Sequence, residues 1–138
     1  MENSKNGSAP AVGPIRVLVA DDAPTALNAM CAYLELEGGF EIVGTASDGL
    51  NLLQQAEIQK PDLVLVDLQM PRMNGLEVAQ RLRAQHPQVA VIVFSEFEAA
   101  VLKAECMQRG ADAFVQKSQM PEQLMREIAR LFPRSHRP

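Results

Sequence analysis

The sequence predicts an α/β protein with a doubly wound, five-stranded parallel sheet and five helices. Two observations predict this class. Short apolar runs alternate five times with segments whose apolar residues recur at helical spacing. The third run, Val64-Leu65-Val66, is apolar on both faces of a strand, as in the middle of a sheet covered by helices. Because parallel strands need crossover connections, usually helices, the alternation favours an open α/β sheet.

Composition limits the function further. The 138 residues fit one domain, and 47% hydrophobic and 22% charged residues are ordinary for a globular chain. The net charge of -4 argues against a nucleic-acid surface, and no apolar run approaches the ~18 residues of a membrane helix. Cys31 and Cys106 lack partners at metal spacing and are predicted to be buried or half-buried free thiols. With no secretory signal, a soluble cytoplasmic protein is expected.

Each predicted strand leads into a helix with recognisable ends. Residues 1–14 are expected to form a disordered leader, 15–132 the domain and 133–138 a short tail. Proline or an aspartate cap suits the helix starts, and glycine or proline the ends. We expect strands at 15–20, 41–46, 64–67, 89–94 and 112–116, and helices from Pro24 to Gly38, from Gly49 to about Ile58, from Gly75 to Gln85, up to about Arg109, and from Pro121 to Pro133.

The predicted helices differ in the strength of their apolar faces. The first carries Leu27, Met30, Cys31 and Leu34, and the last carries Leu124, Ile128 and Leu131. The fourth helix has the weakest face, which we expect at Val101, Ala104 and Met107.

Polar residues end four of the five strands: Asp21-Asp22, Asp67, Ser95 and Lys117. In a parallel sheet these ends share one edge. With the strand order 2-1-3-4-5, an order taken over from doubly wound sheets of this kind, the first and third strands are neighbours. The three carboxylates then lie in one crevice, flanked by a hydroxyl and an ammonium group.

Three carboxylates in one crevice need a proton or a cation among them. Two unit charges about 4 Å apart repel by about 4 kcal/mol at an effective dielectric constant of about 20. Oxygen ligands with a few waters and a phosphate suit Mg²⁺, whereas Ca²⁺ takes more ligands. Aspartate is a type of phosphoryl acceptor, and Lys117 is placed to neutralise phosphoryl oxygens.

Each of these residues also has an ordinary structural interpretation. Asp21-Asp22 and Ser95 suit helix caps, Asp67 suits a turn before Pro71, and a lysine at a strand end is usually a solvated surface residue. All four falling on one edge by accident is much less expected than any one of them alone.

Together the motifs resemble the receiver domains of two-component response regulators over about 15–132. The resemblance rests on Val19-Ala20-Asp21-Asp22, on Val66-Asp67-Leu68-Gln69-Met70-Pro71 with Met73-Asn74-Gly75, on Phe94-Ser95, and on Gly110-Ala111-Asp112-Ala113-Phe114-Val115-Gln116-Lys117. It implies the flavodoxin-like receiver fold. It also implies that Asp67 accepts a phosphoryl group from the phosphohistidine of a sensor histidine kinase or phosphotransfer protein.

The resemblance also implies roles for the other site residues. Asp22 would bind Mg²⁺ directly, Asp21 largely through water, and Asp67 and the backbone carbonyl of Gln69 would complete the protein's share. Ser95 and Lys117 would bind the phosphoryl oxygens. Phe114 would be the aromatic switch residue, although a core aromatic on the last strand is an equal alternative.

The size of the switch can be bounded. Two charge-assisted hydrogen bonds, from Ser95 and Lys117, offer about 3–6 kcal/mol, and taking a two-state equilibrium from about 1:99 to 99:1 needs about 5.5 kcal/mol. Two contacts therefore nearly suffice when the conformations are closely balanced. The resemblance further implies that a downstream effector binds the face made by the fourth helix, fifth strand and fifth helix, and it allows a homodimer that forms on phosphorylation.

Departures from the common pattern concern rates. Ser118 follows Lys117 where the family often has a cis proline, so the isomer of that bond is open. Glu96 follows Ser95 where many receivers have a small residue, and we expect Glu96 to slow both gain and loss of the phosphoryl group. Gln69 is a second residue expected to tune the rates. Ala20, where a branched residue is common, is interpreted as a packing detail.

The leading interpretation is a stand-alone switch that signals by binding partners without substrate turnover. The alternative is the N-terminal receiver of a DNA-binding transcriptional regulator, since the Lys117-Ser118 ending resembles that branch. A phosphatase or phosphotransferase is disfavoured because Gln69 stands where those enzymes carry a second acid. A flavin-binding protein would need a phosphate-cradling loop after the first strand, which the sequence lacks.

Overall fold

The computed structural model describes residues 13–97 and 100–133, and its centre is a five-stranded parallel sheet. The strands are β1 (Ile15–Ala20), β2 (Phe40–Ala46), β3 (Leu63–Asp67), β4 (Ala90–Ser95) and β5 (Ala113–Gln116), in the order β2-β1-β3-β4-β5. The predicted order is therefore confirmed. The predicted leader at 1–14 and tail at 133–138 fall almost wholly outside the described residues.

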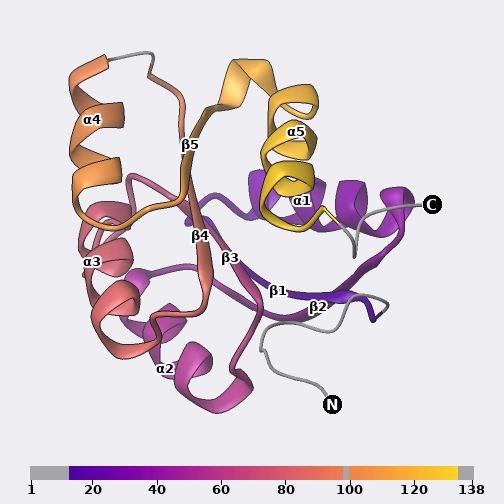
Figure 1. The fold of residues 1–138 in the computed structure, drawn as a ribbon, viewed down its shortest axis with the longest axis horizontal. Coiled ribbons are helices and arrows are strands. Elements are labelled where there is room, and N and C mark those ends of the chain that lie inside the picture. The colour runs from indigo at the N-terminus through magenta and orange to yellow at the C-terminus, as the bar shows by residue number, and fades with distance from the viewer. Residues whose placement is uncertain (1–12, 98–99, 134–138) are drawn as a thin grey trace.

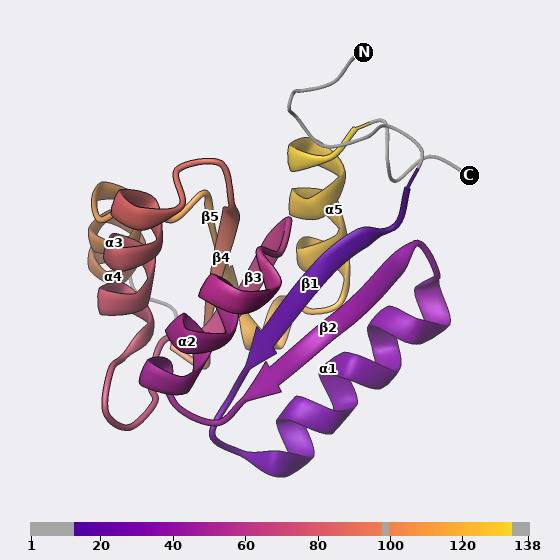
Figure 2. The same cartoon turned by 90° about the horizontal axis from the view of Figure 1, so that it is seen from below.

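Helices cover both faces of the sheet. They are α1 (Pro24–Glu37), α2 (Gly49–Gln59), α3 (Gly75–Gln85), α4 (Ala100–Gln108) and α5 (Glu122–Leu131), with a short 3₁₀ turn, η1 (Lys117–Gln119), before α5. In Figure 1, α1 and α5 lie on one side of the sheet and α2, α3 and α4 on the other. Figure 2 shows the twisted strands running between these two layers. Among the described residues, no helix is long and apolar enough to cross a membrane.

Alternation along the strands divides the interior into two apolar cores, because successive side chains of a strand point to opposite faces. On β1, Val17 and Val19 join the core under α1 and α5, whereas Leu18 and Ala20 join the core under α2, α3 and α4. The strand β3 is buried at all five positions. The apolar run that predicts a central strand is thus explained by two covered faces.

Local sequence fixes the start of α3 beside the end of β3. The Asn74 side chain accepts the Glu77 N–H and the Glu77 side chain accepts the Asn74 N–H, a reciprocal capping box. The Gly75 N–H donates to the Leu68 carbonyl at 2.8 Å. A Cβ at Gly75 would lie 2.8 Å from the Asp67 carbonyl oxygen, so only glycine lets α3 approach this closely.

The predicted face of α4 is wrong. Val101 is 77% exposed, Ala104 is exposed and Met107 is 41% exposed, whereas Cys106 is fully buried and Leu102 is partly buried. The residues of α4 that pack on the core with Phe114 are Leu102 and Cys106, which are four positions apart. The predicted residues, spaced three positions apart, face away from it. Both thiols are free: Cys31 is half-buried and Cys106 buried, as predicted.

The segment that follows α4 is bonded to α3. The Arg83 guanidinium on α3 donates to the carbonyl of Gly110 at 3.1 Å and to the carboxylate of Asp112 at 2.5 Å. Arg109 at the end of α4 donates to Gln80 on α3 at 3.2 Å. The end of α4 and the start of β5 are therefore tied to α3.

Candidate functional site

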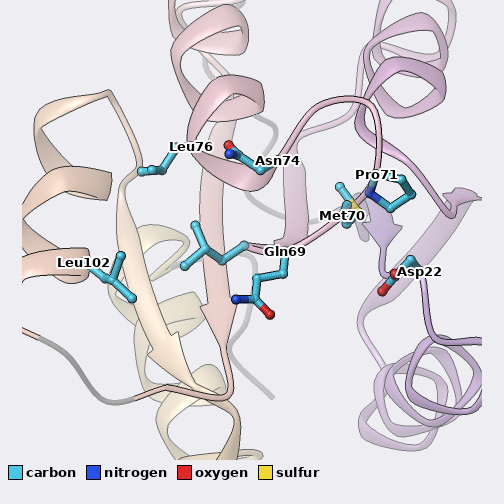
Figure 3. Close-up of a pocket in the computed structure, with 8 residues that line it drawn as sticks. Asp22, Gln69, Met70, Pro71, Asn74, Leu76 and Leu102 are labelled. Carbon is cyan, nitrogen blue, oxygen red and sulfur yellow. The ribbon is translucent and has the colours of Figure 1, made fainter.

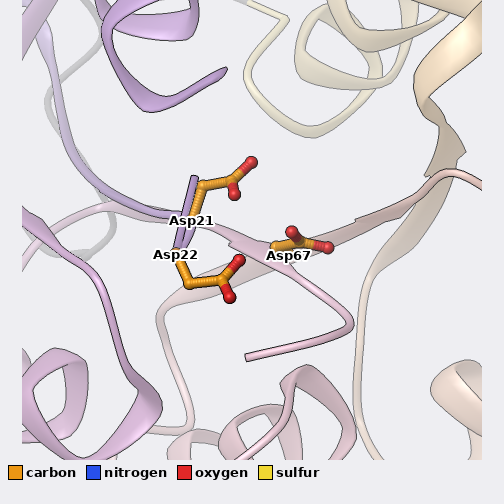
Figure 4. A group of neighbouring side chains, drawn as sticks. All are labelled: Asp21, Asp22 and Asp67. Carbon is orange, nitrogen blue, oxygen red and sulfur yellow. The ribbon is translucent and has the colours of Figure 1, made fainter. Parts of the chain in front are cut away.

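The polar residues predicted to meet at one sheet edge do meet there. Asp21 and Asp22 follow β1, Asp67 ends β3, and Lys117 follows β5. Carboxylate oxygens of Asp21, Asp22 and Asp67 lie within 4.8 Å of one another. Figure 4 shows the three side chains directed toward a common space. Asp21 and Asp67 are buried and Asp22 is exposed, so the cluster is open to solvent on the Asp22 side.

Lys117 links the end of β1 to the end of β3. Its Nζ donates to Asp21 Oδ2 at 3.1 Å and to Asp67 Oδ2 at 3.3 Å, and it lies 5.3 Å from the centroid of the Phe94 ring. The Lys117 side chain is only 18% exposed. The alternative of a solvated surface lysine is therefore wrong.

The carboxylates also bond locally. Asp21 Oδ1 accepts the Ala23 N–H at 2.9 Å, but the residue at the N-cap of α1 is Ala23, so the alternative of an Asp21-Asp22 helix cap is wrong. Asp67 Oδ1 accepts the Gln69 N–H at 3.2 Å. Asp67 is thus a turn residue and a member of the acidic cluster at once, with its second oxygen facing Lys117.

Burial is the main electrostatic influence on Asp67. It raises the pKa of the Asp67 carboxyl to about 6, against the lowering by the Gln69 N–H; the neighbouring Asp21 charge raises it further and Lys117 lowers it. For Lys117, burial by itself lowers the pKa. Hydrogen bonds and charges of Asp21 and Asp67 outweigh that burial, and the net pKa is raised. Lys117 therefore stays charged, whereas ionised Asp67 needs further positive charge.

The residues present fit a hard divalent cation. Asp21, Asp22 and Asp67 offer carboxylate oxygens, the ligands that Mg²⁺ prefers, with room for waters on the exposed Asp22 side. Three clustered carboxylates beside one ammonium leave negative charge uncompensated. A ligand role for the Gln69 carbonyl stays a prediction.

Ser95 lies at the same edge and is 1% exposed. Its Oγ accepts the Phe97 N–H at 3.1 Å, and since residues 96 and 97 are not helical, Ser95 forms a local turn rather than a helix cap. Glu96 is exposed beside it. Phe114 is 7% exposed and belongs to the core under α4, so its place is that of a core aromatic and its switch role stays a prediction.

A groove lies beside the acidic cluster and is not predicted from the sequence. It has a volume of about 600 Å³ and runs between the β3–α3 loop and α4. Figure 3 shows Leu76 and Leu102 at one end, Asp22 at the other and Gln69 between them. Leu68 and Met70 complete the apolar lining. Residues so distant in sequence give no joint signal, because the groove depends on where α4 lies.

A doubly wound sheet with an acidic crevice and a buried lysine at its carboxyl edge defines a receiver-type α/β domain. Residues 17–129 match the family model of the response regulator receiver domain. The chain therefore belongs to this family: it is a receiver domain of a two-component response regulator.

The curated relatives include an enzyme and a response regulator. The chain is 34% identical over 112 residues to the protein-glutamate methylesterase/protein-glutamine glutaminase of Clostridium acetobutylicum, covering 80% of this chain and 32% of that protein. It is 33% identical over 115 residues to the nitrate/nitrite response regulator NarL of Escherichia coli, covering 83% of this chain and 53% of that protein. The chain thus spans a third to a half of these relatives.

Solved structures agree on the fold. The signal receiver domain of a NarL response regulator from Mycobacterium tuberculosis superposes with a TM-score of 0.82 at 27% identity, covering 88% of this chain and 98% of that one. The response regulator domain of Thermotoga maritima CheB gives a TM-score of 0.76 at 27% identity, covering 91% and 98% of the two chains.

Proposed function

We propose that this chain is a phosphorylation-activated switch whose phosphoacceptor is Asp67. The donor is the phosphohistidine of a partner sensor histidine kinase or phosphotransfer protein. The observation that carries the proposal is the position of Asp67: it ends the central strand with one carboxylate oxygen 3.3 Å from Lys117 Nζ and with Asp21 and Asp22 alongside.

In the proposed transfer, an oxygen of ionised Asp67 attacks the phosphorus while the bond from phosphorus to the histidine nitrogen breaks. The leaving imidazole nitrogen keeps the bonding electron pair, and because the other ring nitrogen of the reacting phosphohistidine carries a proton, neutral imidazole leaves. Lys117 moves from its carboxylate partners to a phosphoryl oxygen and offsets its charge. Asp21, Asp22 and Asp67 would hold Mg²⁺, which when bound would shield the acceptor carboxylate from the anionic donor.

The proposed response begins at Ser95. A shift of Ser95 toward the phosphoryl group, to which its hydroxyl donates, moves the Oγ that accepts the Phe97 N–H, so the shift is passed to residues 96 and 97. Phe114 lies in the same core as Cys106 of α4, so a change on β5 is felt by that helix. The face made by α4, β5 and α5 then binds an effector or a second copy of the chain.

A second candidate is that this receiver is the N-terminal part of a DNA-binding transcriptional regulator. The observation that favours it is the relation to NarL, of which the chain spans 53%. The two candidates differ in output and share the chemistry at Asp67. The reading frame around the coding sequence distinguishes them: continuation into a helix-turn-helix domain supports the second candidate.

The experiment for the shared chemistry is incubation with a small phosphodonor such as phosphoramidate, with and without Mg²⁺, read by intact mass. We expect a phosphoryl adduct that needs Mg²⁺ and that peptide mapping places on Asp67. Asp67→Asn is the matched control, because it keeps the shape of the side chain and loses the nucleophile. An unmodified wild-type protein, or an equal adduct on Asp67→Asn, contradicts the proposal.

A further inference from the structure

The groove beside the acidic cluster has no part in the chemistry at Asp67, although it opens onto that cluster. Asp22 belongs to both, and Leu68 and Gln69 directly follow Asp67 in the chain. Its far end is apolar: Leu76 on α3 and Leu102 on α4 are both partly buried and face the same space (Figure 3). An apolar end that leads, through Asp22, to the cluster holding the reacting carboxylate of Asp67 is the form of a subsite for a substrate.

We propose that this groove receives an aliphatic side chain of the protein phosphodonor, next to its phosphohistidine. The inference rests on the proposed function. The occupant follows from continuity, because any donor has to bring its phosphorus to Asp67 and therefore lies across the open rim at Asp22 and Gln69. A protein donor, unlike a small phosphodonor, has neighbouring side chains that reach the far end.

The chemistry of the groove selects the occupying side chain. Leu68, Met70, Leu76 and Leu102 give an apolar floor without charge, and the charged residue lining the groove is Asp22. An acidic side chain would be repelled at the Asp22 end and desolvated at the leucine end. A leucine, isoleucine or valine is stabilised there by burial.

The state of the site favours a donor over an effector. In this structure Asp67 is paired with Lys117 through its carboxylate oxygen, which is the arrangement a donor meets before transfer. The groove is open in that arrangement. An effector that reads phosphorylation would instead use a surface that forms once Lys117 and Ser95 turn to the phosphoryl group.

The test compares two synthetic donors. One is a short peptide with a single phosphohistidine flanked by leucines, prepared with phosphoramidate; the other has serines in place of the leucines. The measured quantity is the ratio of the two rate constants for phosphorylation of Asp67 with Mg²⁺. In the wild type we expect the leucine peptide to react on the order of tenfold faster, the factor expected for burying part of one aliphatic side chain.

The variants use two neighbouring residues of α4. Leu102→Gln should bring the ratio close to unity. Val101→Gln, at a side chain that is 77% exposed and outside the groove, should leave the ratio as in the wild type. Leu76→Gln repeats the test from α3 should Leu102→Gln fail to fold. The ratio is taken within each variant, so a general change of rate cancels.

The outcomes separate this inference from the proposed function. Equal rates for both peptides in the wild type, or a ratio that survives in Leu102→Gln and Leu76→Gln, overturn the inference. Binding of the unphosphorylated leucine peptide that depends on Leu102 only after Asp67 is phosphorylated marks an effector site and overturns it as well. Failure of phosphoramidate to modify wild-type Asp67 contradicts the proposed function instead.

Discussion

Replacing Asp67 with asparagine should make the domain more stable at neutral pH. Burial raises the pKa of Asp67 from its ordinary 3.8 to about 6. A tenfold change in proton affinity corresponds to about 1.36 kcal/mol, so ionised Asp67 lowers the free energy of unfolding by about 3 kcal/mol. Asparagine has a similar shape and no charge. We expect Asp67→Asn to gain about 2–3 kcal/mol at pH above about 6.

The pH dependence gives the sign of this effect. Below the ordinary pKa of 3.8, Asp67 is protonated in both the folded and the unfolded protein, and the two variants should be equally stable. As the pH rises, the unfolded carboxyl ionises first, and the wild type loses stability until the folded carboxyl has also ionised, above its pKa of about 6. The difference between variants should therefore grow between these values and then stay constant.

The assay is urea unfolding of both proteins without Mg²⁺ at a series of pH values. The free energies of unfolding are compared with the same m-value for both proteins. Mg²⁺ should then raise the stability of the wild type more than that of Asp67→Asn, because it binds the folded carboxylate cluster. Asp22→Asn, at an exposed position, is the control for removing one charge and should gain less. A wild type as stable as Asp67→Asn at neutral pH, or a difference independent of pH, would refute the argument.

Three further predictions concern the stability of the fold and the rates at which the phosphoryl group is gained and lost. Leu124→Ala should lower the free energy of unfolding by about 2–5 kcal/mol, because Leu124 is fully buried on the inner face of α5, whereas Leu36→Ala, at a side chain that is 87% exposed, should change it by less than about 0.5 kcal/mol in urea unfolding. Asn74→Ala should cost about 1 kcal/mol by loss of the α3 cap, and a thermal midpoint equal to that of the wild type would contradict the capping role. Glu96→Ala should speed both gain and loss of the phosphoryl group; an unchanged phosphoryl half-life by mass would rule out a rate-limiting role for Glu96.

Features that depend on local chemistry could be predicted from the sequence. Helix α3 runs from Gly75 to Gln85 as predicted, because Asn74 caps it and Pro87 lies beyond its end. Asp67 and Lys117 come together because carboxyl ends of parallel strands share one edge, although the strand order itself came by analogy and not from residue spacing.

Features that depend on how elements rotate could not be predicted. On α4, apolar residues stand at both three-residue and four-residue spacing, so Val101 and Leu102 are equal candidates for burial. In the structure Leu102 packs against the core, and the segment after α4 is bonded to α3 through Arg83 and Arg109, contacts between residues far apart in the sequence. The groove follows from the same choice, since it exists only with Leu102 turned toward the β3–α3 loop.

The close approach of Gly75 to the Asp67 backbone has a mechanical consequence. The Gly75 N–H is bonded to the Leu68 carbonyl, and there is no space for a Cβ at Gly75. The first turn of α3 therefore lies directly on the backbone of Asp67 and Leu68. Strand β3 and helix α3 therefore form one stiff unit, with Asp67 at the point where the strand ends. We therefore expect any movement that phosphorylation causes to occur on the other side of Asp67, at Ser95 and Lys117.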